Sequence, residues 1–434
     1  LLSHQTAVLS QQSEPSDNII SPAPILTDSD LEVELVTEGL KSPTSMAFIG
    51  NHGDMLILEK SGEVILFINE NKSKISLLNF TVNDQTERGL LGVAVINNMS
   101  DSHTIAIPAR SNNQATIPTG GNSINNASTT SPPPTSTFAF FYLTEASKED
   151  RTQVLGNRIY RFEWNDTDKS LSNGTLILDL PVLPGENHNG GKLIADSENR
   201  HIYAVIGDLN RKGMLQNFKN SSLPDDTSVI VRINPDGSPA QGNPFLNVGR
   251  SDASYSNLSK YYAYGIRNSY GMDFDPLSGN LWDTENGPGN SDEINLVLPG
   301  FNSGWQEVMG LAALEGGFDP TDIVDFDGAG VYRDPELVWT NTAGPTALKF
   351  LHSDRLGSQN QNDMFVGDVH NGRLYRFDLN QERTGLVLPE ALADKVIPTP
   401  TSPGLEDIIF GQGFAGITDI EVGPDGSLYV VSIG

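Results

Sequence analysis

Short apolar runs alternate with turn-forming residues along almost the whole chain. From about Leu31 onward, β-branched and aromatic runs of a few residues are separated by clusters of Gly, Asn, Asp and Pro. No segment keeps the 3.6-residue period of an amphipathic helix over several turns. The pattern therefore predicts an all-β protein.

Several of these runs share one form, in which a turn, an apolar strand, a second turn and another strand follow each other. The form occurs in six units, at 53–67, 138–164, 200–237, 279–300, 362–379 and 424–434. Their spacing of about 75 residues suits propeller blades with long insertions on one face. We therefore expect residues 31–434 to form a six-bladed β-propeller, with a β-sandwich of the same strands as the alternative.

Two segments lie outside the strand pattern. Residues 1–30 lack the basic region and the long apolar stretch of a signal peptide, and we expect a disordered leader left after processing. Residues 97–137 are rich in Ser, Thr, Asn and Pro, which predicts a loop inserted in the second blade. The chain stops directly after a strand, so either the segment from Leu31 to Leu40 closes the propeller or the sequence is incomplete.

The composition excludes several classes of function. A formal net charge of −28 would repel phosphate backbones and anionic lipid surfaces, so we expect no nucleic-acid partner. No run of about 18 apolar residues is present, so no membrane span is expected. The absence of cysteine excludes thiol catalysis, thiolate zinc sites and disulfides.

The compartment is indicated only by glycosylation sequons. The chain has eight N-x-S/T sequons, which favour an extracellular or cell-surface glycoprotein. They are Asn71, Asn79, Asn98, Asn126, Asn165, Asn173, Asn220 and Asn257.

Three polar segments can carry chemistry. In 185–193 His188 precedes a Gly-rich turn, and Asp208 ends the next strand, so a propeller places both side chains at the same end of neighbouring strands. A carboxylate beside a histidine fixes its tautomer and supports the imidazolium, which makes the pair a candidate general base. The alternative for such a turn is a hydrogen-bonded loop corner.

The second and third segments offer a cation and hard oxygen ligands. Arg267 and Asn268 lie in a turn between glycines, where a guanidinium can reach a planar or anionic ligand, or else pair with carbonyls of a neighbouring blade. Segment 285–295 and the residues that follow it combine carboxylates, amides and free carbonyls, the ligands that calcium prefers, without the spacing of an EF-hand. A plain acidic turn is the alternative.

Taken in this order, the segments resemble the soluble PQQ-dependent glucose and aldose sugar dehydrogenases, whose glucose/sorbosone dehydrogenase domain is shared by hedgehog-interacting protein. Residues 87–92 look like the first-blade signature of that family, and 265–276 followed by 281–305 is the most specific match. The resemblance runs from about Leu31 to Gly434, interrupted mainly by the 97–137 insertion.

The resemblance implies roles for nine residues. His188 would be the catalytic base, Asp208 its orienting acid and Arg267 the cation that stabilises charge on PQQ. Cofactor contacts and ligands of two calcium ions would come from three further sets. These are Glu87, Arg267, Asn268 and His370 for PQQ, the carbonyls of Gly287 and Pro288 for its calcium, and Glu293 for a second, structural calcium.

The chain also departs from the family. Glu87 stands where the family has a glutamine, His370 where it has a lysine, and Gly416 and Thr418 where glucose-type enzymes have arginines. Two functions follow: a secreted quinoprotein that oxidises aldoses or related polyols, or a non-catalytic extracellular propeller that binds glycans or protein or self-assembles. Calcium-dependent lactonase chemistry would need acidic and amide ligands at the central axis, and the sequence has no clear set.

Overall fold

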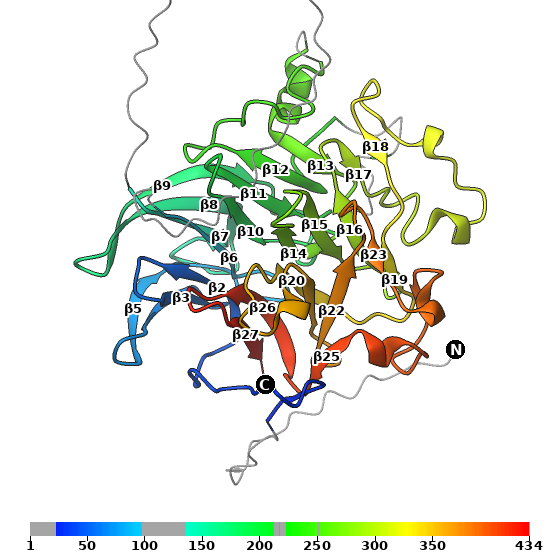
Figure 1. Cartoon of the computed structure of the whole chain (residues 1–434). Coiled ribbons are helices and arrows are strands. Elements are labelled where there is room, and N and C mark those ends of the chain that lie inside the picture. Colours follow the sequence, from blue (N-terminus) through cyan, green and yellow to red (C-terminus); the bar gives the residue numbers. More distant parts are fainter. Residues whose placement is uncertain (1–22, 98–135, 212–216, 218–222, 250–251, 434) are drawn as a thin grey trace, which may run out of the picture.

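The computed structural model describes residues 23–97, 136–211, 217, 223–249 and 252–433. In this part of the chain the strands form six separate sheets set around a centre in a propeller-like arrangement (Figure 1). The all-β prediction is confirmed. The first three sheets comprise β2 (Pro43–Ile49), β3 (Asp54–Glu59), β4 (Glu63–Ile68) and β5 (Ser73–Asn79); β6 (Leu90–Ile96), β7 (Phe138–Ala146), β8 (Val154–Asn165) and β9 (Ser170–Leu180); and β10 (Leu193–Asp196), β11 (His201–Ile206), β12 (Val229–Ile233), β13 (Tyr261–Tyr264), β17 (Phe301–Asn302) and β18 (Val331–Tyr332).

The other three sheets follow in chain order. They comprise β14 (Ser269–Phe274), β15 (Leu281–Glu285), β16 (Asp292–Val297), β19 (Leu337–Trp339) and β24 (Val396–Ile397); β20 (Pro345–Phe350), β21 (Met364–Asp368), β22 (Arg373–Leu379), β25 (Ile409–Gln412), β1 (Ile25–Leu26) and β23 (Leu386–Val387); and β26 (Gly416–Val422) with β27 (Leu428–Ile433).

Short 3-10 helices lie in the connections between strands. They are η1 (Ala253–Lys260), η2 (Ala312–Leu314), η3 (Pro320–Asp322), η4 (Ser358–Asn360), η5 (Glu390–Leu392) and η6 (Leu405–Asp407). No helix in the described ranges is long and apolar enough to cross a bilayer.

The first strands of the six sheets contact one another in a closed order. This order is β2, β6, β10, β14, β20 and β26, and β26 returns to β2. Each of the six repeated units found in the sequence contributes strands to a different sheet. The unit 138–164, for example, supplies β7 and β8, and β7 is buried along almost its whole length because it lies inside its sheet.

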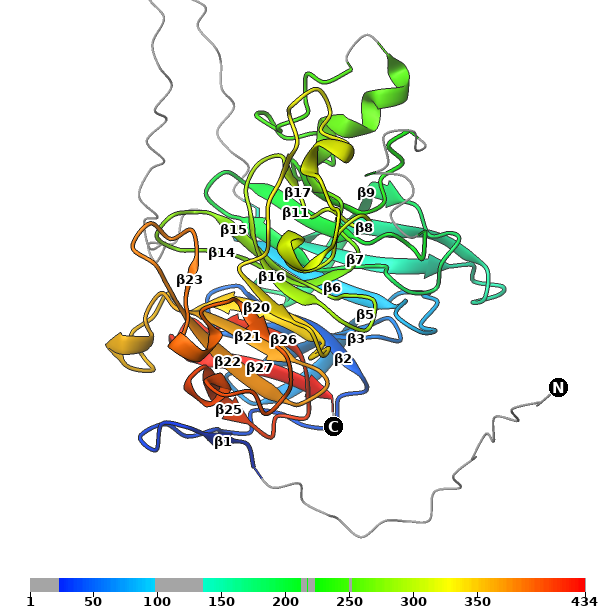
Figure 2. The same cartoon turned by 90° about the vertical axis from the view of Figure 1, so that its right-hand side faces the viewer.

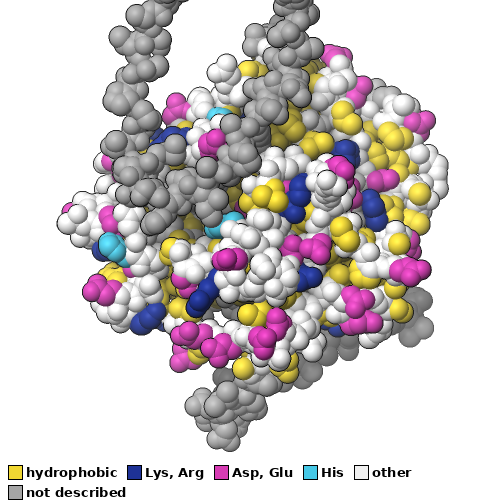
Figure 3. All heavy atoms as spheres, in the orientation of Figure 1, with side chains coloured by type: hydrophobic (Ala, Val, Ile, Leu, Met, Phe, Trp, Pro, Cys, Tyr) yellow, Lys and Arg dark blue, Asp and Glu magenta, His cyan; other side chains and the backbone are white. Residues whose placement is uncertain are grey.

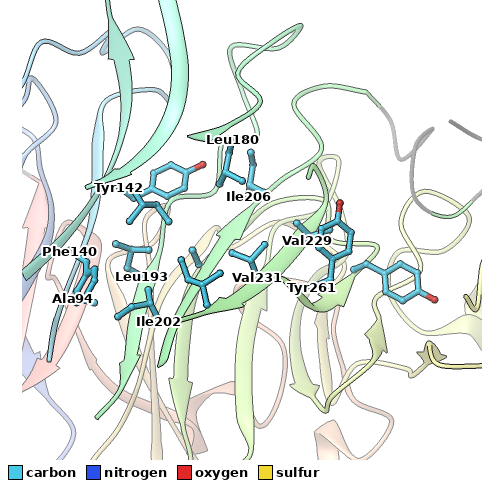
Figure 4. Close-up of a cluster of buried hydrophobic side chains, with 14 of the residues drawn as sticks. Ala94, Phe140, Tyr142, Leu180, Leu193, Ile202, Ile206, Val229, Val231 and Tyr261 are labelled. Atoms are coloured by element: carbon cyan, nitrogen blue, oxygen red, sulfur yellow. The ribbon is translucent and has the colours of Figure 1, made fainter. Parts of the chain in front are cut away.

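Apolar side chains fill the space between neighbouring sheets. Figure 4 shows one such cluster, in which Phe140 and Tyr142 of β7 face Ile202 of β11 and Val231 of β12. Each sheet has apolar side chains on both faces, and packing against a neighbouring sheet removes these side chains from water. The outer surface carries acidic side chains spread over the face shown in Figure 3, consistent with the net charge.

The N-terminal expectations are partly corrected. Ile25 and Leu26, placed in the disordered leader, form β1, which pairs with the open edge of β25 while Leu26 packs on apolar residues of that sheet. Segment 31–40 forms no strand, but Val36 and Leu40 pack beside β2 and β27. Figure 2 shows β1 running along one end of the molecule near β25. Residues 1–22 and most of the 97–137 insertion lie outside the described residues.

Charged side chains meet at the centre of the sheets. Lys192, just before β10, pairs with Asp419 of β26 at 2.5 Å, and both side chains are almost fully buried. Lys349 of β20 pairs with Glu421 of β26 at 2.7 Å and with Asp273 of β14 at 3.4 Å. Acidic groups therefore do reach the axis, but Asp419, Glu421 and Asp273 each lie within 4 Å of a lysine ammonium group, which balances their charge.

Candidate active site

The predicted site residues lie in connections on one side of the sheets. Glu87, His188 and Arg267 follow the fourth strands of three consecutive sheets (β5, β9 and β13) and precede β6, β10 and β14. Asp208 and His370 follow the second strands β11 and β21. Because strands alternate in direction within each sheet, these two kinds of connection emerge on the same side.

His188 and Asp208 form the pair that the sequence predicted. The His188 Nδ1 atom lies 2.5 Å from Asp208 Oδ1, and Asp208 is buried whereas the imidazole is 13% exposed. Asp208 Oδ1 also accepts the Asn210 N–H at 2.9 Å, and Asp208 Oδ2 accepts the Trp305 indole N–H at 2.7 Å. Burial alone would raise the pKa of Asp208, but its contacts with His188, Trp305 and Asn210 outweigh burial and hold the pKa below its usual range.

This geometry fixes the histidine tautomer. An ionised carboxylate only accepts hydrogen bonds, so the neutral imidazole carries its hydrogen on Nδ1, toward Asp208, and its lone pair on Nε2. The partly exposed imidazole can therefore take a proton at Nε2 from a molecule bound on this side of the sheets, where these connections emerge and which is called the mouth below.

Arg267 lies against the same indole ring. Its guanidinium carbon is 5.3 Å from the centre of the Trp305 ring, and its Nη1 donates to the Asn286 carbonyl at 2.7 Å. Its backbone N–H donates to Glu285 Oε1 at 2.6 Å. The Arg267 Nε and Asn286 Oδ1 atoms are buried and have no hydrogen-bond partner, so polar valences remain there for a bound molecule.

Asn268 and Glu87 connect the arginine turn with the histidine loop. The Asn268 amide donates to Glu87 Oε2 at 3.0 Å, and its Oδ1 accepts the Gly190 N–H at 3.2 Å. Glu87 Oε2 also accepts the His188 N–H at 2.6 Å and the Tyr270 hydroxyl at 2.5 Å. Glu87, His188, Asp208, Arg267 and Asn268 thus belong to one connected group.

Three carboxylates are buried behind this group. Asp283 and Glu285 on β15 face Asn295 and Glu293, their cross-strand partners on β16. Burial raises the pKa of Glu285 to about 7 and the pKa values of Asp283 and Glu293 well above their usual range. Both Asp283 oxygens are buried and make no hydrogen bond of good geometry, although the Asn295 and Ser269 side chains beside them partly offset the effect of burial on the pKa of Asp283. Both Glu293 oxygens accept hydrogen bonds, from the Gly310 N–H and the Asn295 amide.

The predicted calcium loop lies between these two strands. Gly287 is required by its sharp turn, because a Cβ there would lie 1.7 Å from the Asn290 carbonyl oxygen. Gly287 N–H donates to Asp292 Oδ1 at 2.9 Å, and the chain is half-exposed at Gly287 and exposed at Pro288. In the described part of the chain, no group of three or more acidic or histidine side chains is arranged to hold a metal ion.

The other three positions at which the chain departs from the family lie in the last two sheets, with His370 after β21 and Gly416 and Thr418 in β26. His370 is exposed, with its Nδ1 3.5 Å from the Thr342 carbonyl, and this contact does not lead to His188 or Arg267. A Cβ at Gly416 would lie 2.9 Å from Val369 Cγ2 and 3.1 Å from Ile433 Cγ1, so any side chain at this position would crowd both neighbours. Thr418 Oγ1 donates to the Val431 carbonyl at 3.4 Å.

Several residues of the site were missed by the sequence analysis. Trp305, Tyr270 and Glu285 each touch a predicted site residue, and Ser303 donates to Glu285 Oε2 at 2.6 Å. Tyr270 lies in segment 265–276, and Glu285, Ser303 and Trp305 lie in segment 281–305. The resemblance was based on these two segments, so membership in them was the available signal.

Comparison with known proteins agrees with this geometry. The family model described as Glucose / Sorbosone dehydrogenase matches residues 40–433. The chain belongs to this family. The resemblance drawn from the motifs is thereby confirmed, and the matched range covers every predicted site residue.

Two curated relatives match parts of the chain. Aldose sugar dehydrogenase YliI of Escherichia coli is 28% identical over 271 residues, which are 62% of this chain and 63% of that protein. Quinoprotein glucose dehydrogenase B of Acinetobacter calcoaceticus is 31% identical over 175 residues, 33% of this chain and 34% of that protein. The matched regions span less than two thirds of either relative.

Solved structures match nearly the whole chain. A putative oxidoreductase (glucose dehydrogenase) from Thermus thermophilus has a TM-score of 0.63 at 25% identity, covering 92% of this chain and 93% of its own. The PQQ-bound aldose sugar dehydrogenase of Streptomyces coelicolor has a TM-score of 0.61 at 21% identity, covering 94% and 92%. The likeness confirms the propeller-like fold.

Proposed function

We propose that the protein is a PQQ-dependent dehydrogenase that oxidises aldoses or related polyols on a six-bladed β-propeller. The observation that carries the proposal is the His188–Asp208 pair beside Arg267 at one mouth, in a chain of the glucose/sorbosone dehydrogenase family. The closed order of contacts among the six first strands supports six blades.

The residues present fit PQQ on the His188 side of the mouth. The unpartnered Arg267 Nε and Asn286 Oδ1 offer polar contacts, and Arg267 supplies the cation that an anionic quinone needs. PQQ, when bound, accepts two electrons as hydride from the sugar carbon. Gly416 and Thr418 carry no charge, so we expect weaker cofactor binding than in an enzyme with arginines at these two positions.

Each protein group has one task in this proposal. His188 Nε2 takes the proton of the sugar hydroxyl, and Asp208 keeps the imidazole oriented and stabilises its charged form. Arg267 stabilises negative charge at the mouth, and Trp305 holds both Asp208 and Arg267 in place.

Calcium is proposed at the carbonyls of Gly287 and Pro288, which the Asp292 contact keeps in a tight turn. For a second cation, Asp283 is a better candidate than Glu293, because neither of its buried oxygens makes a hydrogen bond of good geometry, whereas both Glu293 oxygens do. Metal analysis after dialysis against calcium tests both sites, since Asp283→Asn should remove one equivalent and leave the other.

A purified sample with added PQQ and Ca²⁺ tests the enzyme proposal. We expect dye-linked oxidation of aldoses that is lost in His188→Ala and retained in His52→Ala, because His52 is an exposed histidine with one weak ion pair to Asp166. Absence of activity together with absence of PQQ binding by calorimetry would refute it. That outcome favours the second candidate, a non-catalytic propeller that binds glycans or protein or self-assembles. The close approach of Val369 and Ile433 to Gly416 supports this candidate.

Export to the extracellular space or cell surface is also a proposal. Asn71, Asn79, Asn165 and Asn173 are exposed, whereas Asn257 donates to the Pro224 carbonyl. The other three sequons lie outside the described residues. Intact-mass measurement of the protein from its native source tests whether the exposed sequons carry sugars.

A further inference from the structure

One carboxylate oxygen joins the two halves of the candidate active site. Glu87 Oε2 accepts hydrogen bonds from the His188 N–H at 2.6 Å, the Tyr270 hydroxyl at 2.5 Å and the Asn268 amide at 3.0 Å. These donors come from the β9–β10 connection, from β14 and from the β13–β14 connection. Three donors satisfy this oxygen, so it has no acceptor capacity left for a ligand.

The neighbours of Glu87 hold the same histidine loop. Arg88 is buried, and its Nη2 donates to the Val182 carbonyl at 3.0 Å and to the Gly185 carbonyl at 2.8 Å. Thr86 Oγ1 donates to the Glu186 carbonyl at 2.7 Å. Three consecutive residues of the β5–β6 connection therefore bind the loop 182–188 at four points.

The loop needs such support because of its backbone conformation. His188 has φ 61°, in the left-handed region that a residue with a Cβ adopts only at a cost. The His188 N–H points to the Glu87 carboxylate, and a hydrogen bond to an ionised acceptor is stronger than one to a neutral group. Removing this acceptor leaves the N–H of a strained residue without its partner.

We propose that Glu87 is a positioning residue that holds His188 in its left-handed conformation and is not a ligand of the cofactor. Its negative charge would repel the carboxylates of an anionic quinone, and its bonded oxygen faces protein donors. The role in catalysis rests on the proposed function, whereas the role in holding the loop concerns the protein without cofactor.

Hydrogen exchange of the His188 amide in the protein without cofactor tests the structural part. In Glu87→Ala we expect this amide to exchange about 100-fold faster, because a charge-assisted hydrogen bond is lost. In Glu87→Gln the amide oxygen still accepts, so we expect a change below about 5-fold. Glu149→Ala and Glu149→Gln are the controls, because Glu149 is an exposed glutamate bonded to Ser147.

Kinetics and PQQ titration test the catalytic part. We expect Glu87→Ala to lower kcat by about 100-fold, with KM for sugar and PQQ affinity within about 3-fold of the wild type, and Glu87→Gln to restore most of kcat. A loss of PQQ affinity of 10-fold or more in both variants would show that Glu87 binds the cofactor and would overturn the proposal. Unchanged exchange of the His188 amide in Glu87→Ala would overturn the proposal even if the protein has no dehydrogenase activity. If Glu87→Ala does not fold, Glu87→Gln and Tyr270→Phe test the proposal instead. Both variants must keep the PQQ affinity of the wild type, and a loss of affinity would overturn the proposal.

Discussion

Replacing Asp208 by asparagine changes the site most selectively, because the side chain keeps its shape and loses its charge. In the wild type, Asp208 Oδ1 faces His188 Nδ1 and the Asn210 N–H, and Oδ2 faces the Trp305 indole N–H. An asparagine has one acceptor oxygen and one NH2 group, so it cannot serve both sides. With its oxygen toward Trp305, its NH2 group faces His188 and forces the tautomer that has no lone pair at Nε2.

The other orientation is also costly. With the oxygen toward His188, the buried Trp305 N–H loses its acceptor, which destabilises the fold by about 1–3 kcal/mol, and the imidazolium loses its counter-charge. The equivalent change in a serine protease triad lowers kcat about 10⁴-fold. We expect Asp208→Asn to lower kcat by roughly 10³-fold, about 4 kcal/mol in the barrier, with KM for sugar changed less than about 3-fold.

The assay is dye-linked sugar oxidation with PQQ and Ca²⁺, accompanied by nitrogen NMR of the His188 ring to report the tautomer. Asp150→Asn is the control, since Asp150 is fully exposed and its Oδ1 bonds only Thr152. A kcat within 10-fold of the wild type, with the Nδ1–H tautomer retained, would refute the assigned role of Asp208.

Three further predictions concern packing and charge. Lys192→Met leaves Asp419 buried without its cation and should destabilise the protein by about 3–5 kcal/mol in chemical denaturation; a loss below 1 kcal/mol contradicts the account. Asp283→Asn should stabilise the calcium-free protein more at pH 8 than at pH 5, because burial raises the pKa of this acid and its ionisation costs stability as the pH rises above the unfolded pKa of about 3.9. Equal effects at both pH values would contradict this. Trp305→Phe removes the indole donor to Asp208 and should lower kcat by about 10-fold and stability by about 1.5–3 kcal/mol, measured by steady-state kinetics and unfolding; unchanged values of both would exclude the positioning role.

The strands could be predicted from the sequence because their signal is local. The alternation and turns of 138–164 sufficed to place β7 and β8. The pairing of Ile25–Leu26 with β25 could not be predicted, because two apolar residues carry no period and the partner strand is almost four hundred residues away in the chain.

The same division holds for the site. His188 and Asp208 were predicted to meet because His188 precedes a Gly-rich turn and Asp208 ends the next strand, which places both at the same end of neighbouring strands. The Trp305 contact with Asp208 and the Lys192 contact with Asp419 join residues 97 and 227 positions apart, so only the closed arrangement of sheets brings them together. The sequence motifs identified the polar residues of the candidate site, and the fold determined which of these residues are in contact.

In the proposed function, His188 takes a proton from the sugar and Arg267 stabilises negative charge in the presence of PQQ. The most direct measurement is the absorption spectrum of the purified protein reconstituted with PQQ and Ca²⁺, recorded before and after an aldose is added without any dye. The account predicts stoichiometric binding and conversion of the quinone to its reduced form, with no conversion in His188→Ala. Binding without reduction by any aldose or polyol, or no binding at all, would contradict it.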